Sequence, residues 1–276
     1  MNKAAKIALG IGAAGAALFG TACFLTAPGR ATAEQKRPFM GRNIAHRGLY
    51  KEDQSIPENT LSAFALAAEQ GYGIELDVHI TDDDRLVVFH DDDLERMTGE
   101  EGLVEDQMWR ELKELCLADT DEHMPLFSEV LALIDGRVPI ILELKPDSRR
   151  NELCERVLEF LRTYKGDICV ESFDPFIVGW FRKHAPDILR GQLSQPPEDF
   201  KDDLSPVKAF ALGNVLTNFI GRPHFLAYKI GRKSLGARLC RMMGVMKVGW
   251  TSHEPSSEID HDTVIFEHYN PSLRFK

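Results

Sequence analysis

The segment 73–81 constrains the fold more than any other stretch of the chain. It reads GIELDVHIT, in which apolar residues alternate strictly with Glu75, Asp77 and His79. Because successive side chains of a strand point to opposite faces, the pattern predicts a strand with one apolar and one acidic face. Two carboxylates on one partly buried face repel each other unless a cation lies between them. The pattern therefore indicates either a metal site or a strand whose acidic face is solvated.

Three further apolar runs end at clusters of reactive side chains. They are 138–146 with Glu143 and Lys145, 86–94 with His90 at the head of an acidic run, and 43–48 with His46 and Arg47. In α/β proteins with parallel sheets, reactive groups gather at the carboxyl ends of the strands. Four such ends in one half of the chain favour a single shared site over unrelated solvated loops.

Strand-like and helix-like segments alternate through most of the chain after residue 43, which predicts parallel strands joined by right-handed crossovers. The charged, irregular segment 93–124 interrupts this order, as an insertion would. The runs 225–228 and 246–251 are predicted as the last barrel strands, and 263–267 as a final extended piece. About 240 residues remain after the N-terminal segment, which is the usual size of one α/β barrel.

Seven short motifs follow one another in an order known from one enzyme family. They are HRG at 46–48, PENT at 57–60, ELDV at 75–78, VFHDD at 88–92, TG at 98–99, ELKP at 143–146 and SF at 172–173. On these motifs the chain resembles the glycerophosphodiester phosphodiesterase family from about residue 43 to residue 270. The resemblance implies an α/β fold, a TIM (β/α)8 barrel with a small insertion after the third strand. It also implies a divalent metal held by Glu75, Asp77 and Glu143, with His46 and His90 as the acid–base pair.

The chemistry of a phosphodiester explains why these residue types suit the task. A cation must neutralise the phosphoryl oxygens, and three carboxylates offer the hard oxygen ligands that Mg²⁺ or Ca²⁺ prefers. A base must activate the attacking oxygen and an acid must protonate the leaving alkoxide, and histidine can do either near neutral pH. The sequence leaves open which histidine is the base, and whether water or a hydroxyl of the substrate attacks.

Four other residues are candidates for binding or support. Arg47 can hold a phosphate oxygen with two hydrogen bonds, and Lys145 can pair with Glu143 or with the phosphate. Trp250 is predicted either to line the pocket beside the glycerol or to lie in the core. Glu58 is expected to orient neighbouring groups or to act as a charge at a helix start, rather than to bind metal.

Composition narrows the class of partner. The formal net charge is −10 and no long basic run is visible, which disfavours nucleic acid. A hydrophobic content of 43% is enough for a full core, so disorder is not the expectation. The five cysteines form no CxxC pair and no zinc-type spacing.

The N-terminus has the pattern of an export segment. Residues 7–27 are uncharged and follow Lys3 and Lys6. Such a run is long enough to cross a bilayer, and the lysines predict a barrel outside the cytoplasm. A retained signal-anchor is preferred; a signal peptide cleaved at the ATA of 31–33 and a lipoprotein modified at Cys23 are the alternatives. The expected division is 1–33 anchor or signal, 34–42 linker and 43–276 barrel.

The expected function is metal-dependent hydrolysis of a small-molecule glycerophosphodiester to glycerol phosphate and an alcohol. One alternative keeps the site but changes the substrate. It is a lysophospholipase D-like or phospholipase C-like activity on membrane lipids, with the N-terminal segment expected to hold the site near the membrane. Another is a non-catalytic binding barrel. The set of two histidines and three carboxylates argues against it, because a binding module would not need all five.

Overall fold

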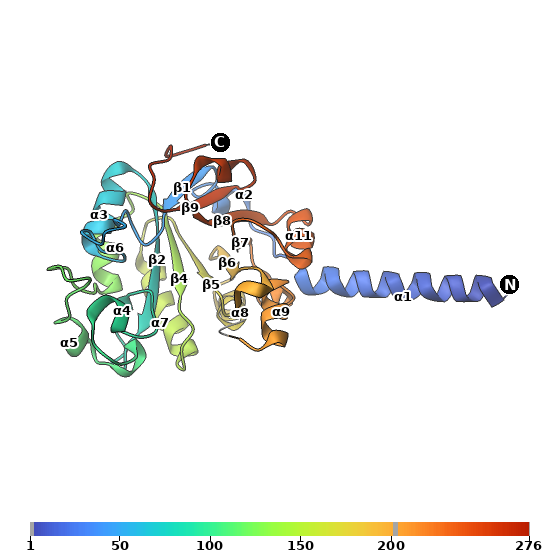
Figure 1. Ribbon diagram of the computed structural model, residues 1–276, viewed down its shortest axis with the longest axis horizontal. Helices are drawn as coiled ribbons and strands as arrows, with labels where there is room; N and C mark the ends of the chain where they lie inside the picture. The colour runs from blue at the N-terminus through green and yellow to red at the C-terminus, as the bar shows by residue number, and fades with distance from the viewer. Residues whose placement is uncertain (1–2, 201–203, 276) are drawn as a thin grey trace.

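The computed structural model describes residues 3–200 and 204–275, with the side chains of the first helix described from residue 15 on. In this part of the chain, eight parallel strands close into a barrel surrounded by helices, which confirms the predicted TIM fold (Figure 1). The ring closes where β1 pairs with β2. Its strands are, in order, β1 (Arg42–Ala45), β2 (Gly73–Ile80), β4 (Ile140–Leu144), β5 (Ile168–Ser172), β6 (Arg190–Ser194), β7 (Phe225–Lys229), β8 (Met246–Ser252) and β9 (Thr263–Phe266).

The helices of the outer layer begin and end at recognisable signals. At the start of α3, the Thr60 hydroxyl accepts a hydrogen bond from the Ala63 amide, and the helix ends at Gly71 with φ 82°. Because Thr60 supplies this cap, Asn59 is left to contact the barrel interior. The described helices after the N-terminal region and outside the insertion are α3 (Leu61–Gln70), α6 (Phe127–Ile134), α7 (Arg150–Thr163), α8 (Pro175–His184), η2 (Pro197–Phe200), α9 (Pro206–Gly213), α10 (Asn218–Gly221), α11 (Leu235–Met242) and η3 (Pro255–Ile259).

Apolar side chains fill two layers, one on each side of the strands. The outward-facing Leu76 and Leu142 pack against the helices in the main core. The inward-facing Ile44, Ile141 and Phe225 fill the barrel interior together with other apolar residues. On β2 and β4 the inward positions that follow carry carboxylates instead, so the polar site rests on an apolar floor.

Two strand predictions need correction. The run after residue 86 forms β3 (Leu86–Val88), which pairs antiparallel with β2 and lies outside the ring. A short turn joins β2 to β3, and only an antiparallel neighbour can follow so short a connection. The last barrel strand is β9, which pairs with both β8 and β1, and not the run 246–251.

The segment 93–124 forms a small unit beside the barrel, as predicted for an insertion. It contains α4 (Glu95–Thr98), η1 (Val104–Asp106) and α5 (Trp109–Leu112). Its own apolar cluster includes Phe89, Leu112 and Met124. This cluster fixes the chain that follows β3, and with it the position of His90.

The first helix, α1 (Lys3–Thr26), projects from the flank of the barrel (Figure 1). Within the described residues, no helix combines the length and hydrophobicity that crossing a bilayer requires. The segment after α1 packs on the barrel and includes the short helix α2 (Ala33–Lys36). The Gly29 amide donates to Pro223 O at 2.9 Å, and Phe39 is only 2% exposed. The chain between α1 and β1, which includes the predicted linker 34–42, is therefore held against the barrel.

Candidate active site

Three carboxylates meet in the barrel interior on two neighbouring strands. The parallel register sets Asp77 of β2 beside Glu143 of β4, and Glu75 lies two residues earlier on the same face of β2. One oxygen from each of the three lies within 4.8 Å of the others, and the residues are 1–6% exposed. The structure thus brings together the three predicted metal ligands.

The pKa values of these carboxylates show that ionising all three is unfavourable without a cation. Burial and the charges of Asp77 and Glu143 raise the pKa of Glu75 well above its usual range. Burial raises the pKa of Glu143 to about 7, although Lys145 opposes the shift. Burial also opposes the ionisation of Asp77, but Lys145, His90 and Arg47 outweigh it and lower its pKa. The cluster therefore holds one readily ionised carboxylate, Asp77, beside two carboxylates whose ionisation is disfavoured.

The donor set fits a divalent cation. All three groups are carboxylates, the hard ligands that Mg²⁺ and Ca²⁺ take. The Oε1 atom of Glu143 is buried and makes no hydrogen bond. The Lys145 ammonium lies 3.0 Å from that oxygen and 2.9 Å from Asp77 Oδ1, so it already neutralises part of the cluster. Its own pKa is raised, because the two carboxylates outweigh its burial.

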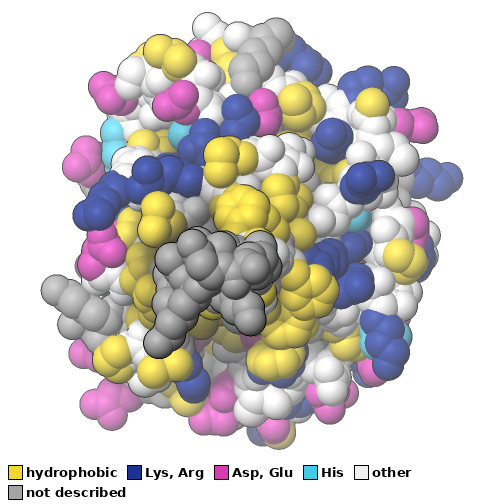
Figure 2. Space-filling model, turned by 90° about the vertical axis from the view of Figure 1, so that its right-hand side faces the viewer, with side chains coloured by type: hydrophobic (Ala, Val, Ile, Leu, Met, Phe, Trp, Pro, Cys, Tyr) yellow, Lys and Arg dark blue, Asp and Glu magenta, His cyan; other side chains and the backbone are white. Residues whose placement is uncertain are grey.

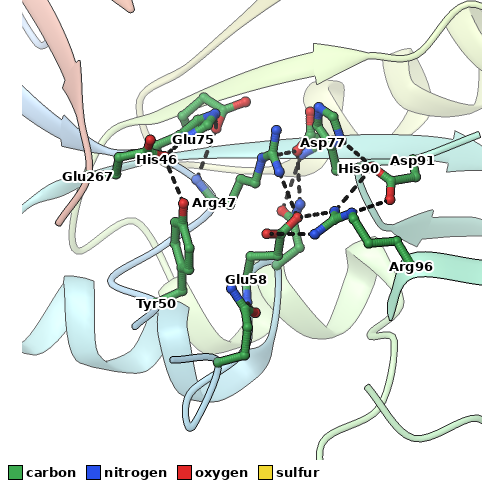
Figure 3. A network of polar contacts seen from close by, with 12 residues as sticks. His46, Arg47, Tyr50, Glu58, Glu75, Asp77, His90, Asp91, Arg96 and Glu267 are labelled. Atoms are coloured by element: carbon green, nitrogen blue, oxygen red, sulfur yellow. Dashed lines mark hydrogen bonds and ion pairs between the residues drawn. The ribbon is translucent and has the colours of Figure 1, made fainter. Parts of the chain in front are cut away.

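His46 follows β1 and lies beside Glu75 (Figure 3). Its Nδ1 is 2.6 Å from Glu267 Oε2, which also accepts a hydrogen bond of 2.7 Å from the Tyr50 hydroxyl. Its Nε2 is 4.0 Å from Glu75 Oε2. Burial lowers the pKa of His46 although Glu267 opposes the shift. The pKa of Glu267 falls to about 2, because its bonds to His46 and Tyr50 outweigh its burial.

His90 lies on the other side of the cluster, near Asp77 (Figure 3). Its Nδ1 is 2.6 Å from Oδ1 of the adjacent Asp91, and Arg96 Nε donates to Asp91 Oδ2 at 2.6 Å. Burial and the charge of Lys145 lower the pKa of His90. Each predicted acid–base histidine is thus held through Nδ1 by a carboxylate.

A tight turn after β1 places Arg47. Arg47 and Gly48 have φ of 51° and 83°, and a Cβ on Gly48 would lie 2.8 Å from Ala63 backbone, so this position requires glycine. The turn points the Arg47 amide at Glu75 Oε2, 3.0 Å away. The Arg47 guanidinium pairs with Glu58 at 2.6 Å, and its Nε, 3.7 Å from Asp77, is buried without a hydrogen bond.

Glu58 and Asn59 connect the helix start to the site. Glu58 Oε1 accepts hydrogen bonds of 2.6 Å from both Arg47 and Arg96, so one carboxylate links the surroundings of the two histidines. Asn59 Nδ2 donates to Asp77 Oδ2 at 2.8 Å, which holds that carboxylate in place. The structure places Glu58 as a support for arginines and not within the carboxylate cluster.

Trp250 packs with the apolar residues that fill the barrel interior. It lies on β8, and its aromatic partner is Phe173, with ring centroids 5.7 Å apart. Its indole Nε1 is buried without a hydrogen bond, although the residue is half-buried overall. An unpaired buried donor is costly, so Nε1 is available to a ligand or a water.

Sequence reasoning missed several residues that the fold brings in. Glu267 and Tyr50 are the partners of His46, and Arg96 binds both Asp91 and Glu58. Glu171 of β5 lies beside Glu143 in register, is 1% exposed, and its burial raises its pKa well above the usual range. A carboxylate directly after the run 263–266 was the available signal for Glu267, because it repeats the pattern of the other strand ends.

Fold and site together define a (β/α)8 barrel with a buried, metal-type carboxylate cluster between two histidines. The model of the glycerophosphoryl diester phosphodiesterase family matches residues 46–264, and the chain belongs to that family. This confirms the resemblance that the motifs indicated.

Individual relatives match part of their own length. A glycerophosphodiester phosphodiesterase of Caldanaerobacter subterraneus subsp. tengcongensis is 33% identical over 163 residues, which cover 55% of this chain and 66% of the relative. A lysophospholipase D of Rattus norvegicus is 36% identical over 144 residues, covering 48% and 44%. The matched region thus spans less than two thirds of these curated relatives.

Solved structures match more of the chain. A glycerophosphodiester phosphodiesterase of Thermotoga maritima is 27% identical with a TM-score of 0.61, covering 81% of this chain and 93% of that one. A phosphodiesterase of Oleispira antarctica, solved with sn-glycerol-3-phosphate as product, has a TM-score of 0.66 at 24% identity and covers 83% and 93%. The second likeness concerns the fold alone.

Proposed function

We propose that this protein is a metal-dependent phosphodiesterase that hydrolyses glycerophosphodiesters to glycerol phosphate and an alcohol. The observation that carries the proposal is the buried cluster of Glu75, Asp77 and Glu143 between His46 and His90. Membership of the family and the names of its relatives support the same activity.

The carboxylates are proposed as ligands of Mg²⁺ or Ca²⁺. A bound divalent cation would neutralise charge on the phosphoryl oxygens. Lys145 and Arg47 add positive charge at the same place, and the buried Arg47 Nε has a free donor for a phosphate oxygen. Trp250 is proposed to lie further along the substrate, where its indole Nε1 can donate.

The two histidines are proposed to move the protons. Each faces a carboxylate through Nδ1, so the neutral ring carries its proton there and leaves Nε2 free to accept one. One histidine would take the proton of the attacking oxygen, and the other, entering protonated, would give its proton to the leaving alkoxide. Glu267 and Asp91 would hold the rings in position and stabilise the protonated form.

A lysophospholipase D-like activity is the second candidate. It is favoured by the relative of that name and by the apolar segment 7–27, which would bring the site to a lipid surface. The reaction at phosphorus would use the same residues. The two activities would differ only in the part of the site that contacts the rest of the substrate.

The deciding experiment measures hydrolysis of glycerophosphocholine and lysophosphatidylcholine by the full chain in detergent. Each substrate is tested in EDTA and after Mg²⁺ or Ca²⁺ is restored, with the double variant His46→Ala/His90→Ala as the inactive control. Faster hydrolysis of glycerophosphocholine supports the first proposal, and faster hydrolysis of lysophosphatidylcholine the second. Full activity after EDTA treatment and dialysis would exclude the metal mechanism, and no metal-dependent release from either diester would exclude both.

The location outside the cytoplasm is also proposed, since Lys3 and Lys6 precede the uncharged run. An alkaline phosphatase fused to the C-terminus should then be active and a green fluorescent protein dark. The opposite pair of results would place the barrel in the cytoplasm.

A further inference from the structure

One stretch of this acidic chain contains no acidic residue. Between Leu204 and His253 there is no Asp or Glu, whereas the whole chain has a formal net charge of −10. The same stretch carries eight basic residues, spaced singly or in pairs, so no basic run is evident in the sequence. They are Lys208, Arg222, Lys229, Arg232, Lys233, Arg238, Arg241 and Lys247.

The fold gathers much of this stretch around the base of α1. The last turn of α1 packs against α10 and α11. Phe24 of α1 stacks on Phe219 of α10, with ring centroids 6.1 Å apart. The Arg222 guanidinium lies 4.7 Å from the Phe24 ring and donates to Phe24 O at 2.8 Å. The chain that follows α1 is also packed on the barrel. The flank formed by α10 and α11 is therefore held against the last turn of α1.

Large apolar side chains stand exposed on the same flank. Leu235 and Met242 at the two ends of α11 are 75% and 77% exposed, and Val207 and Phe210 of α9 are 79% and 59% exposed. Figure 2 looks along α1 onto this face, where hydrophobic side chains surround its base and Lys and Arg lie to either side. Exposed apolar groups gathered in this way on a soluble domain usually mark an interaction surface.

Apolar and basic groups share one shallow hollow between α9 and α11. Phe210 and Leu235 line it together with Arg232, Lys233 and Arg238, and with the carboxylate Glu198. Within the described residues, no ion pair joins Arg232 or Arg238 to a carboxylate, whereas Lys229 pairs with Asp199. The charges of Arg232 and Arg238 are thus available to an external anion.

We propose that this flank, formed by α9, α10 and α11, docks on the surface of a bilayer that contains anionic lipids. Exposed Leu, Met and Phe side chains can enter the headgroup region, while Lys and Arg side chains are attracted to an anionic lipid surface. A second copy of the chain is the less favourable occupant, because a symmetric contact would bring like charges together.

The proposed docking has a geometric consequence. α1 leaves the barrel at α10 and α11, and the carboxylate cluster lies on β2 and β4, across the ring from β7. The docking flank and the candidate active site are therefore formed by different elements. The proposal does not depend on the hydrolytic activity, since it concerns a different face.

Hydrogen–deuterium exchange of the full chain in lipid nanodiscs tests it. Discs of phosphatidylcholine alone are compared with discs containing about one third phosphatidylglycerol. We expect the amides of α9 and α11 to exchange roughly tenfold more slowly in the anionic discs, and α7 to be unchanged. Both Arg232→Glu/Arg238→Glu and Leu235→Ser/Met242→Ser should remove the difference.

The control is Arg85→Glu/Lys165→Glu, which makes the same change of charge at two exposed positions away from α9, α10 and α11. It should keep the protection. Equal exchange of α9 and α11 in both kinds of disc would overturn the proposal. Protection that appears in detergent and grows with protein concentration would also overturn it, because a second copy would then be the occupant.

Discussion

His46 and His90 present the same chemistry on two differently built supports. His46 follows a barrel strand and is held by Glu267, which follows β9 more than two hundred residues later. His90 follows β3, which is not a barrel strand, and is held by its own neighbour Asp91. The first arrangement exists only when the barrel is closed, because β9 must pair with β1. The second is local, and depends on the insertion to place it.

This difference separates what positions each histidine from what sets its pKa. Both rings meet a carboxylate at 2.6 Å, and burial lowers the pKa of both. Their exposures differ: the side chain of His90 is 32% exposed and that of His46 is 16%. Glu58 connects the two through Arg47 and Arg96. We call each histidine together with the carboxylate that holds it an arm of the site. The two arms should respond alike to changes in the carboxylate cluster and differently to changes in the carboxylates that hold them.

The largest effect is expected where both arms depend on one element, the carboxylate cluster. Asp77→Asn should lower kcat/KM about a thousandfold or more, because the charge stabilisation lost is several kcal/mol. Calorimetry should show weakened Mg²⁺ or Ca²⁺ binding. Glu171→Gln is the matched control, a buried carboxylate beside the cluster, and should keep metal binding. Equal metal affinity in Asp77→Asn and the wild type would contradict the ligand assignment.

Removal of each histidine should come next and should distinguish the arms. His46→Ala and His90→Ala are each expected to lose about 10²–10⁴ in kcat on glycerophosphocholine. On a p-nitrophenyl diester, whose leaving group needs no acid, the variant that lacks the acid should recover most. Circular dichroism checks the fold. Equal recovery in both variants would mean that the histidines do not divide the two roles.

A smaller loss is expected from the carboxylates that hold the rings. Glu267→Gln and Asp91→Asn should each lose about ten- to a hundredfold in kcat, by analogy with the loss found when a metal-bound histidine loses its carboxylate partner. Tyr50→Phe removes only one hydrogen bond to Glu267 and should cost about tenfold or less. A Tyr50→Phe loss as large as that of Glu267→Gln would show that the hydroxyl itself meets the substrate.

The smallest effect concerns pH and compares the cluster with the His46 support. The pKa of Glu143 rises from 4.5 to about 7 on folding, so the metal-free protein binds extra protons between these values and loses stability as pH rises through them. Glu267 has its pKa lowered to about 2, so its contribution is present above pH 4.5 and lost as pH falls toward 2.

In EDTA, the Tm of the wild type should therefore fall by a few degrees relative to that of Glu143→Gln as pH rises from 5.5 to 7.5. This comparison cancels the contribution of the buried histidines, whose lowered pKa values act in the opposite direction. The Tm of the wild type relative to Glu267→Gln should not change in this window. Added Mg²⁺ or Ca²⁺ should raise Tm more at pH 7.5, where the ligands are ionised. A wild-type Tm that keeps the same distance from the Tm of Glu143→Gln at both pH values would contradict the raised pKa of Glu143.

The candidate site was partly predictable, because some of its residues share one strand and others follow separate strands. Glu75 and Asp77 share one strand face, so alternation alone places them together. Glu143 and His46 each follow an apolar run, so both were expected at the same edge of the sheet, and both lie there. His90 was expected there on the same ground and does lie near Asp77, but it follows β3, which runs back along β2 instead of continuing the ring. Trp250 was predicted either to line the pocket beside the glycerol or to lie in the core, and the structure places it beside Phe173.

By itself, the sequence determined the alternation of strands and helices, the acidic strand face and the ordered motifs, because these depend on local periodicity and neighbouring residue types. Only the tertiary structure decided that Glu267 holds His46, that Glu58 joins two arginines, and that scattered basic residues gather around the base of α1. These are contacts between segments far apart in the chain, and they depend on which strands pair to close the barrel. Local patterning carries no information about that closure, so the contact between Glu267 and His46 appears only once β9 pairs with β1.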